Sequence, residues 1–148
     1  MHRAESMPIR AATSQRGLTL IEVLIAVLVL SIGLLGLAGL QATSLQFNHS
    51  ANLRSQATNL AYEMTDRMRA NRDAALNGQY NLALTATPSA GTVPGDDLTA
   101  WRDALSDRLP SGTGSVQVDA NGIATVVVEW DDSRGAETEM QFVLTTQL

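Results

Sequence analysis

Residues 16–40 read RGLTLIEVLIAVLVLSIGLLGLAGL, and this stretch decides how the chain is built. The 23 residues from Leu18 to Leu40 carry a single charge, on Glu22, in an otherwise apolar run. As a helix they would extend about 35 Å, which is enough to cross a hydrocarbon core of about 30 Å. The stretch therefore predicts a membrane-spanning helix over residues 18–42, with a carboxylate near its start.

Glu22 is the unusual residue of this span. A charge at the centre of a bilayer costs at least about 2.5 kcal/mol, so an ionisable side chain there usually serves a function. Gly17, five residues earlier, offers a small and flexible residue at which a protease can bind the backbone. Cleavage after Gly17 would create an amine on Leu18. Glu22 could then neutralise that amine from one helical turn away or from a neighbouring subunit, because a paired charge in apolar surroundings costs much less than an unpaired one.

Charge is distributed unevenly about the span. All ten basic residues are arginine; three of them precede Gly17, and the chain after Gly17 holds the other seven against fourteen carboxylates, Glu22 included, a net charge of −7. The positive-inside rule then predicts one pass through a membrane, with residues 1–17 in the cytoplasm and the residues beyond about 42 on the other side. The acidic exported part argues against nucleic-acid binding. The absence of cysteine means that it carries no disulfide.

The apolar run is too long for the core of a secretory signal peptide, and a helical pattern continues beyond it. We therefore expect the span to stay in the protein. Residues 1–17 have no periodicity and are interpreted as a leader that is removed, with Met7 as an alternative start. Residues 43–76 are expected to continue the helix in amphipathic form, without a stop before Asn77-Gly78. Apolar side chains there recur on one face of a 3.6-residue period: Leu53, Ala57, Leu60, Ala61, Met64 and Met68.

Residues 77–148 are predicted to form an exported globular domain. A loop over 77–96, with a possible short strand at Tyr80–Leu84, leads to a short helix capped by Asp96 or Asp97. Strands are expected at 115–119, 123–130 and 137–147, the first two joined by an Asn121-Gly122 hairpin turn. The predicted fold class is α+β: a long N-terminal helix packed on an antiparallel meander of three or four strands. The apolar residues expected in the short helix and the two tryptophans are interpreted as core: Leu98, Trp101, Leu105, Leu109 and Trp130.

Gly33, Gly36 and Gly39 form a second motif within the span. Each costs about 1 kcal/mol of helix stability relative to alanine in water. At i, i+3 and i+6 they leave a groove in which another helix can approach closely. They are candidate helix-packing residues, against the alternative that glycine is merely common in membrane helices.

The exported part offers no recognisable catalytic or cofactor site. The pairs Asp96/Asp97 and Asp131/Asp132 and the turn at Asp119 could in principle bind calcium, but a full ligand set is missing, which favours turns and helix caps. His2 and His49 are isolated, and there is no glycine-rich phosphate loop. We therefore predict no enzyme activity, no metal, no cofactor and no small-molecule substrate.

The heptapeptide at residues 16–22 resembles the class III signal of type IV prepilins. The resemblance implies that a membrane prepilin peptidase cuts after Gly17 and that Leu18 becomes the methylated N-terminus. It also implies that Glu22 of an incoming subunit pairs with the Leu18 amine of the subunit already in the filament, which sets the axial register. Leu18 departs from the phenylalanine usual in the family, a position at which the peptidase is generally tolerant.

Three further segments, 29–41, 61–71 and 77–80, look like the PilV type of minor pilin. This resemblance implies a type IV pilin-like fold and a subunit that helps to initiate pilus assembly and modifies the fibre, in pilus biogenesis, twitching motility and adhesion. Implied partners are other minor and major pilins, the inner-membrane assembly platform and membrane lipid. One alternative is a minor pseudopilin of a type II secretion system. Another is a membrane-tethered exported enzyme or binding protein, which would keep an uncleaved N-terminus.

Overall fold

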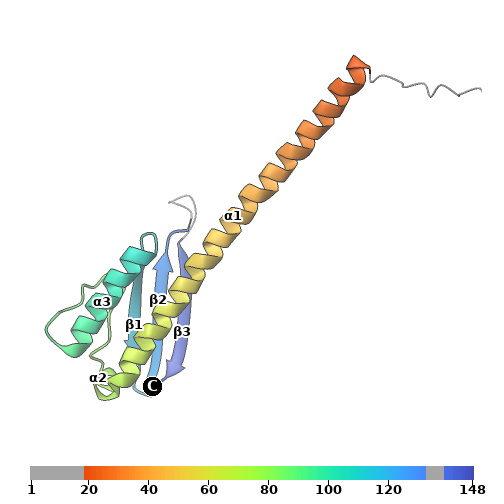
Figure 1. The fold of residues 1–148 in the computed structure, drawn as a ribbon. Coiled ribbons are helices and arrows are strands. Elements are labelled where there is room, and N and C mark those ends of the chain that lie inside the picture. Colours follow the sequence, from red (N-terminus) through yellow and green to blue (C-terminus); the bar gives the residue numbers. More distant parts are fainter. Residues whose placement is uncertain (1–18, 133–138) are drawn as a thin grey trace, which may run out of the picture. The chain divides into compact units, whose positions relative to one another are not determined.

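The computed structural model describes residues 19–132 and 139–148. Three helices precede three strands: α1 (Leu20–Ala70), α2 (Arg72–Leu76), α3 (Val93–Arg108), β1 (Thr113–Val118), β2 (Ile123–Trp130) and β3 (Met140–Gln147) (Figure 1). The chain divides into two compact units, residues 1–43 and 44–148. The predicted α+β class, with a long N-terminal helix and a small antiparallel sheet, is confirmed.

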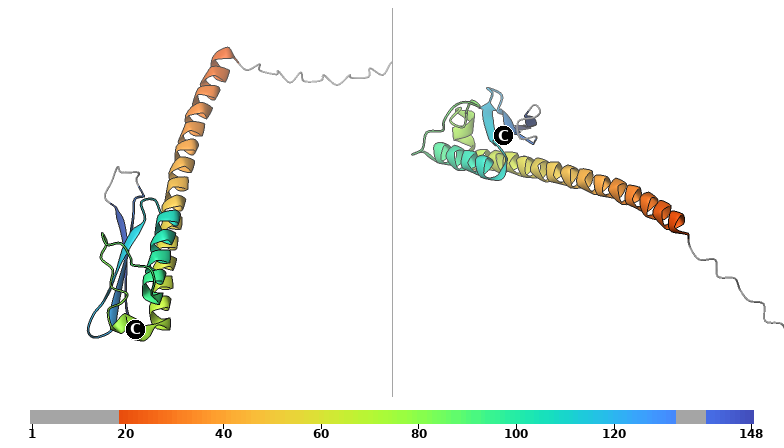
Figure 2. Two further views of the ribbon diagram at one scale, coloured as in Figure 1. Left: turned by 90° about the vertical axis from the view of Figure 1, so that its left-hand side faces the viewer. Right: turned by 90° about the horizontal axis from the view of Figure 1, so that it is seen from above.

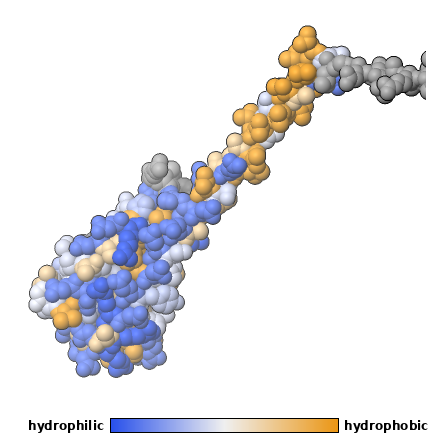
Figure 3. Space-filling model, in the orientation of Figure 1, coloured by the Kyte–Doolittle hydropathy of each residue, from blue (hydrophilic) through white to orange (hydrophobic). Residues whose placement is uncertain are grey.

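The first unit contains the apolar part of α1. This helix is long and apolar enough to cross a membrane, and its apolar side chains are exposed (Figure 3). Two hydroxyl groups satisfy themselves within the helix, because Ser31 Oγ donates to the Val27 carbonyl at 2.7 Å and Thr43 Oγ1 to the Gly39 carbonyl at 3.1 Å. Such bonds remove the cost of carrying a hydroxyl into lipid. The described part of this unit therefore has the properties of a membrane span.

In the second unit the amphipathic half of α1 buries the predicted stripe. Its members are 0–4% exposed: Leu53, Ala57, Leu60, Ala61, Met64 and Met68. The expectation of an uninterrupted helix to residue 76 is wrong. α1 ends at Ala70, Asn71 leaves helical geometry with φ −124° and ψ 54°, and the separate helix α2 follows. Asparagine disfavours helix interiors because its amide competes for backbone hydrogen bonds.

The prediction that Asp96 or Asp97 caps the short helix is also wrong. α3 begins at Val93, and the cap is Thr92, whose hydroxyl accepts from the Gly95 amide at 3.2 Å. Pro94 lies in the first turn, where a missing amide hydrogen costs nothing. The helix thus starts within the segment that was expected to be loop.

The three strands form an antiparallel sheet in the order β1-β2-β3. The β2 bounds match the prediction, and Gly122 takes the positive φ of +76° that the turn into β2 requires. β1 starts and ends slightly earlier than predicted, and the first residues predicted for the third strand, 137 and 138, lie outside the described residues. The possible strand at Tyr80–Leu84 is reduced to a single bridge, in which Leu82 pairs with Val116.

The core of the second unit lies between the sheet and two helices. α1 and α3 lie side by side on the same face of the sheet (Figure 2). The core residues predicted for α3 and the strands are buried, and Trp101 and Trp130 are each 1% exposed. Trp101 also donates its indole Nε1 hydrogen to the Leu60 carbonyl oxygen at 2.9 Å, which joins α3 to α1 inside the core.

Candidate processing and assembly site

The start of α1 carries the candidate assembly residue. The Glu22 amide donates to the Thr19 carbonyl at 3.0 Å and to Thr19 Oγ1 at 3.3 Å, so Thr19 caps the helix. Thr-x-x-Glu is the sequence of a capping box, and a carboxylate in the first turn also faces the positive end of the helix dipole. This cap was not predicted from the sequence, although the Thr19-x-x-Glu22 spacing is the pattern of a capping box. Gly17 and Leu18 lie outside the described residues.

Glu22 lies among exposed apolar side chains. Leu20 is 85% exposed and Ile21 63%, and no ion pair engages Glu22 within the described residues. The next charged side chain along the chain is Arg54. A single chain thus presents one carboxylate at the beginning of a long uncharged helix, where an opposite charge in apolar surroundings would be strongly favoured as a partner.

The three glycines of the span lie in open surroundings. Apart from the chain neighbours and the adjacent helix backbone, no atom of the described residues comes within 4 Å of the position that a Cβ would take at Gly33, Gly36 or Gly39. Nothing within one chain therefore requires glycine there, and packing against another helix stays a prediction.

Two family models match adjacent segments of this chain. Residues 13–38 match the prokaryotic N-terminal methylation motif, and residues 39–101 match the family of type IV pilin Tt1218. Together the matches run without a gap through more than half of the chain. The chain belongs to the type IV pilins. No curated protein and no solved structure matches it significantly.

The methylation motif covers Gly17, Leu18 and Glu22, and the family is one of structural subunits rather than enzymes. Membership implies association with other pilins and processing by a prepilin peptidase. The long apolar helix fits membrane anchoring followed by pilus assembly. The α+β structure described above is that of a type IV pilin.

A polar cluster holds three segments of the pilin's globular unit together. Asp97, in the first turns of α3, accepts from Arg67 of α1 at 2.8 Å and from the Tyr80 hydroxyl at 2.6 Å. Arg67 also pairs with Glu63 at 2.7 Å. Burial and the bond to Asp97 raise the pKa of Tyr80 to about 12, and the bond to Glu63 is the largest influence raising the pKa of Arg67. The cluster keeps Tyr80 neutral and Arg67 charged.

Arg102 of α3 holds the loop that precedes α3. Its Nη2 donates to the carbonyl oxygens of Ala83 at 3.0 Å, Leu84 at 2.7 Å and Ala86 at 3.3 Å, and its Nη1 donates to Thr113 Oγ1. Burial lowers the pKa of Arg102. Arg102 carries no sequence signal of this role, because its partners are brought to it only by the fold.

Two of the aspartates considered for calcium, Asp96 and Asp119, accept hydrogen bonds from backbone amides. Asp96 accepts from the Gly91 amide at 2.9 Å, and Asp119 Oδ1 accepts from the amides of Asn121 at 2.9 Å and Ile123 at 2.8 Å. Within residues 19–132 and 139–148 there is no group of three or more His, Cys, Asp or Glu that could hold a metal ion.

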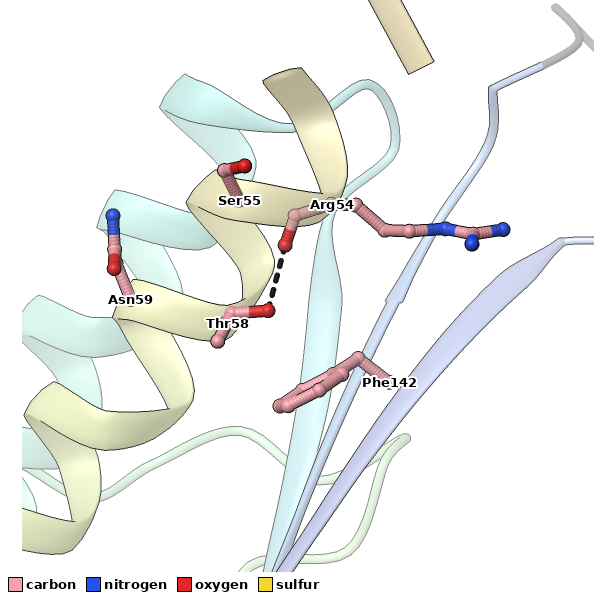
Figure 4. A pocket seen from close by; sticks show the side chains of 5 residues that line it. All are labelled: Arg54, Ser55, Thr58, Asn59 and Phe142. Atoms are coloured by element: carbon pink, nitrogen blue, oxygen red, sulfur yellow. Dashed lines mark hydrogen bonds between the residues drawn. The ribbon is translucent and has the colours of Figure 1, made fainter. Parts of the chain in front are cut away.

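One shallow groove opens between α1 and β3. Arg54, Ser55, Thr58 and Asn59 line it from the helix, and Phe142 lines it from the strand (Figure 4). Thr58 Oγ1 donates to the Arg54 carbonyl at 2.8 Å, so this hydroxyl is occupied within the helix. The lining has neither a nucleophile with a base nor a set of metal ligands.

Proposed function

We propose that this pilin is a minor subunit of a type IV pilus, of the PilV type. It enters the inner membrane as a precursor with residues 1–17 in the cytoplasm and its globular unit in the periplasm. Prepilin peptidase cuts between Gly17 and Leu18 and methylates Leu18. The mature subunit then helps to prime assembly and modifies the fibre, and it needs no catalytic activity of its own for this role.

The observation that carries the proposal is the methylation motif at a helix start whose one carboxylate, Glu22, forms no ion pair within residues 19–132 and 139–148. In this account Glu22 pairs with the Leu18 amine of a subunit already in the filament. The Gly33, Gly36 and Gly39 groove supports close packing of the helices once the subunits leave lipid. The partners are other minor and major pilins, with the inner-membrane platform acting in assembly.

Mass spectrometry of the mature N-terminus tests the processing step. The expected product begins at methyl-Leu18 in cells with active prepilin peptidase and at Met1 or Met7 in cells without it. An unprocessed N-terminus in the presence of the peptidase would exclude the proposal and favour a membrane-tethered exported protein. Immunogold labelling of this protein separates the pilus subunit from a minor pseudopilin. Label on sheared pili supports the pilus subunit, and label on a type II secretion pseudopilus supports the pseudopilin.

A further inference from the structure

The two edge strands of the sheet, β1 and β3, differ in the hydrogen bonding of their outward backbone groups. On the β1 edge, the Leu82 amide donates to the Val116 carbonyl at 2.8 Å, and the Val116 amide donates to the Leu82 carbonyl at 2.9 Å. The Val118 amide on the same edge donates to Asn81 Oδ1 at 2.7 Å. The loop before α3 thereby bonds the outward backbone groups of Val116 and the amide of Val118, which protects this part of the β1 edge from pairing with another chain.

Within the part of the chain that the structure describes, the β3 edge has no such cover. The Leu148 amide bonds the Gly122 carbonyl, so with the observed register the even-numbered residues of β3 bond β2. The odd-numbered residues then direct their amide and carbonyl groups away from β2: Gln141, Val143, Thr145 and Gln147. Among residues 19–132 and 139–148, no backbone group outside β2 bonds β3.

The sequence of β3 lacks the features that usually blunt an edge strand. Residues 140–148 read MQFVLTTQL, without a charge or a proline, and the eight register pairs with β2 run without a bulge. Val143 is 50% exposed. A long, uncharged edge strand without a bulge is a template for strand addition.

Two arginines from different helices, Arg54 of α1 and Arg72 of α2, stand at the two ends of this strand. Arg54 reaches from the helix across the groove beside Phe142, near the start of β3 (Figure 4). Arg72 donates to the Leu148 carbonyl at 3.1 Å, at the other end. Neither arginine pairs with a carboxylate among the described residues. Arg69, which bonds Thr146 at 3.0 Å, is already paired with Asp66, and Glu129 is hydrogen-bonded to Gln141.

We infer that the open edge of β3 is a docking site for an extended segment of another pilus subunit, one with an uncharged core and acidic flanks. That the added strand comes from another pilus subunit rests on the proposed function. A second copy of this chain is a poorer occupant. Antiparallel pairing of two β3 strands would bring Arg54 of one copy to Arg72 of the other, and like charges are unfavourable there.

Hydrogen exchange of the full chain in detergent tests the inference with synthetic peptides. One peptide alternates valine and threonine between pairs of aspartates, and the matched control has arginines in place of the aspartates. At about ten times its Kd, the acidic peptide is expected to slow exchange at Val143 and Thr145 by about tenfold. Equal protection by both peptides, or by neither, would overturn the inference, and peptide-free protection that grows with protein concentration would favour a second copy.

The variant Val143→Pro separates edge pairing from folding. The Val143 amide points away from β2, so proline removes a donor to the added strand but no bond of the existing sheet. Val143→Thr retains the amide as the matched control. We expect Val143→Pro to abolish peptide protection at Thr145 while the β2-facing amides of Phe142 and Leu144 stay slow. If those amides remain slow and the peptide binds both variants equally, the inference is wrong. Because this test needs neither cleavage nor filament incorporation, its failure is distinct from failure of the proposed function.

Discussion

Trp101 and Leu60 are joined across the core by a hydrogen bond of 2.9 Å from the indole to a main-chain carbonyl of α1. The indole is 1% exposed and Leu60 is fully buried. The contact connects α3 to α1 at a point that water does not reach. It fixes the position of α3 over the sheet, with the loop before α3 held in turn by Arg102.

Trp101→Phe should therefore destabilise the globular unit. The substitution removes the bond to Leu60 and leaves space beside the core, with an expected loss of about 1–3 kcal/mol in the free energy of unfolding. Urea unfolding of the full chain in detergent, followed by circular dichroism, measures the loss. Tyr62→Phe is the control, because Tyr62 is 51% exposed and should change stability little. Equal midpoints for the two variants would contradict the role of the indole bond.

Arg102→Ala should loosen the loop before α3 more than it destabilises the core. The guanidinium bridges the carbonyls of Ala83, Leu84 and Ala86, and lysine cannot reproduce this planar set of donors. Limited proteolysis should therefore cleave within residues 83–91 faster in both the alanine and the lysine variants. Arg108→Lys provides a control at the exposed end of α3. Unchanged cleavage in Arg102→Lys would show that charge alone holds the loop.

Tyr80 gives stability that should disappear in alkali. Its pKa is raised from the ordinary value of 10.0 to about 12, because burial and the bond to Asp97 favour the neutral phenol. The stabilisation that accompanies this raised pKa is fully present below pH 10 and is lost as the pH rises through 12. The free energy of unfolding should fall by an amount on the order of 2 kcal/mol across this window. Unfolding at pH 9 and pH 11.5 measures it, and Tyr80→Phe should flatten the slope across this window. Tyr62→Phe, which keeps Tyr80, should leave the slope in place.

Gly17→Val should block processing. A β-branched residue stiffens the backbone that must enter the peptidase site, so the precursor accumulates in the membrane without a methylated Leu18. Immunoblotting of membrane fractions and mass spectrometry of the N-terminus report the result. Gly33→Val serves as the control that leaves the cut site intact. Normal processing of Gly17→Val would place the cleavage elsewhere.

Glu22→Ala should separate cleavage from assembly. The peptide bond after Gly17 remains, so Leu18 is still exposed and methylated, but the subunit enters pili at least about tenfold less efficiently because the amine of its neighbour stays unpaired. Quantitative immunoblotting of sheared pili against whole cells measures the ratio. Thr19→Ala weakens the helix cap and keeps the carboxylate, so it should incorporate nearly normally. Wild-type incorporation of Glu22→Ala would refute the pairing role.

Most of the secondary structure could be predicted because its signals are local. The period of the Leu53–Met68 stripe, the alternation in Ile123–Trp130 and the Asn121-Gly122 turn each lie within a few neighbouring residues. The errors arose where two local signals competed. Thr92 and Asp96 are both good caps, and the choice of Thr92 follows from the bond that Asp96 makes back to Gly91.

The functional signal is likewise continuous in sequence. In the proposed function, the glycine, the carboxylate and the long apolar run are adjacent because one peptidase and one membrane would act on them together. Composition and spacing within residues 16–40 predicted a membrane span with a carboxylate near its start. The resemblance of residues 16–22 to the prepilin signal predicted a type IV pilin, and the family matches confirm that membership. Only the tertiary structure revealed the contacts between residues that are far apart in the sequence. These are Arg67 with Asp97, Arg102 with the carbonyls of the loop before α3, and Leu82 with Val116. Those contacts form only when packing of the apolar faces brings the segments together, and the same packing leaves the β3 edge open.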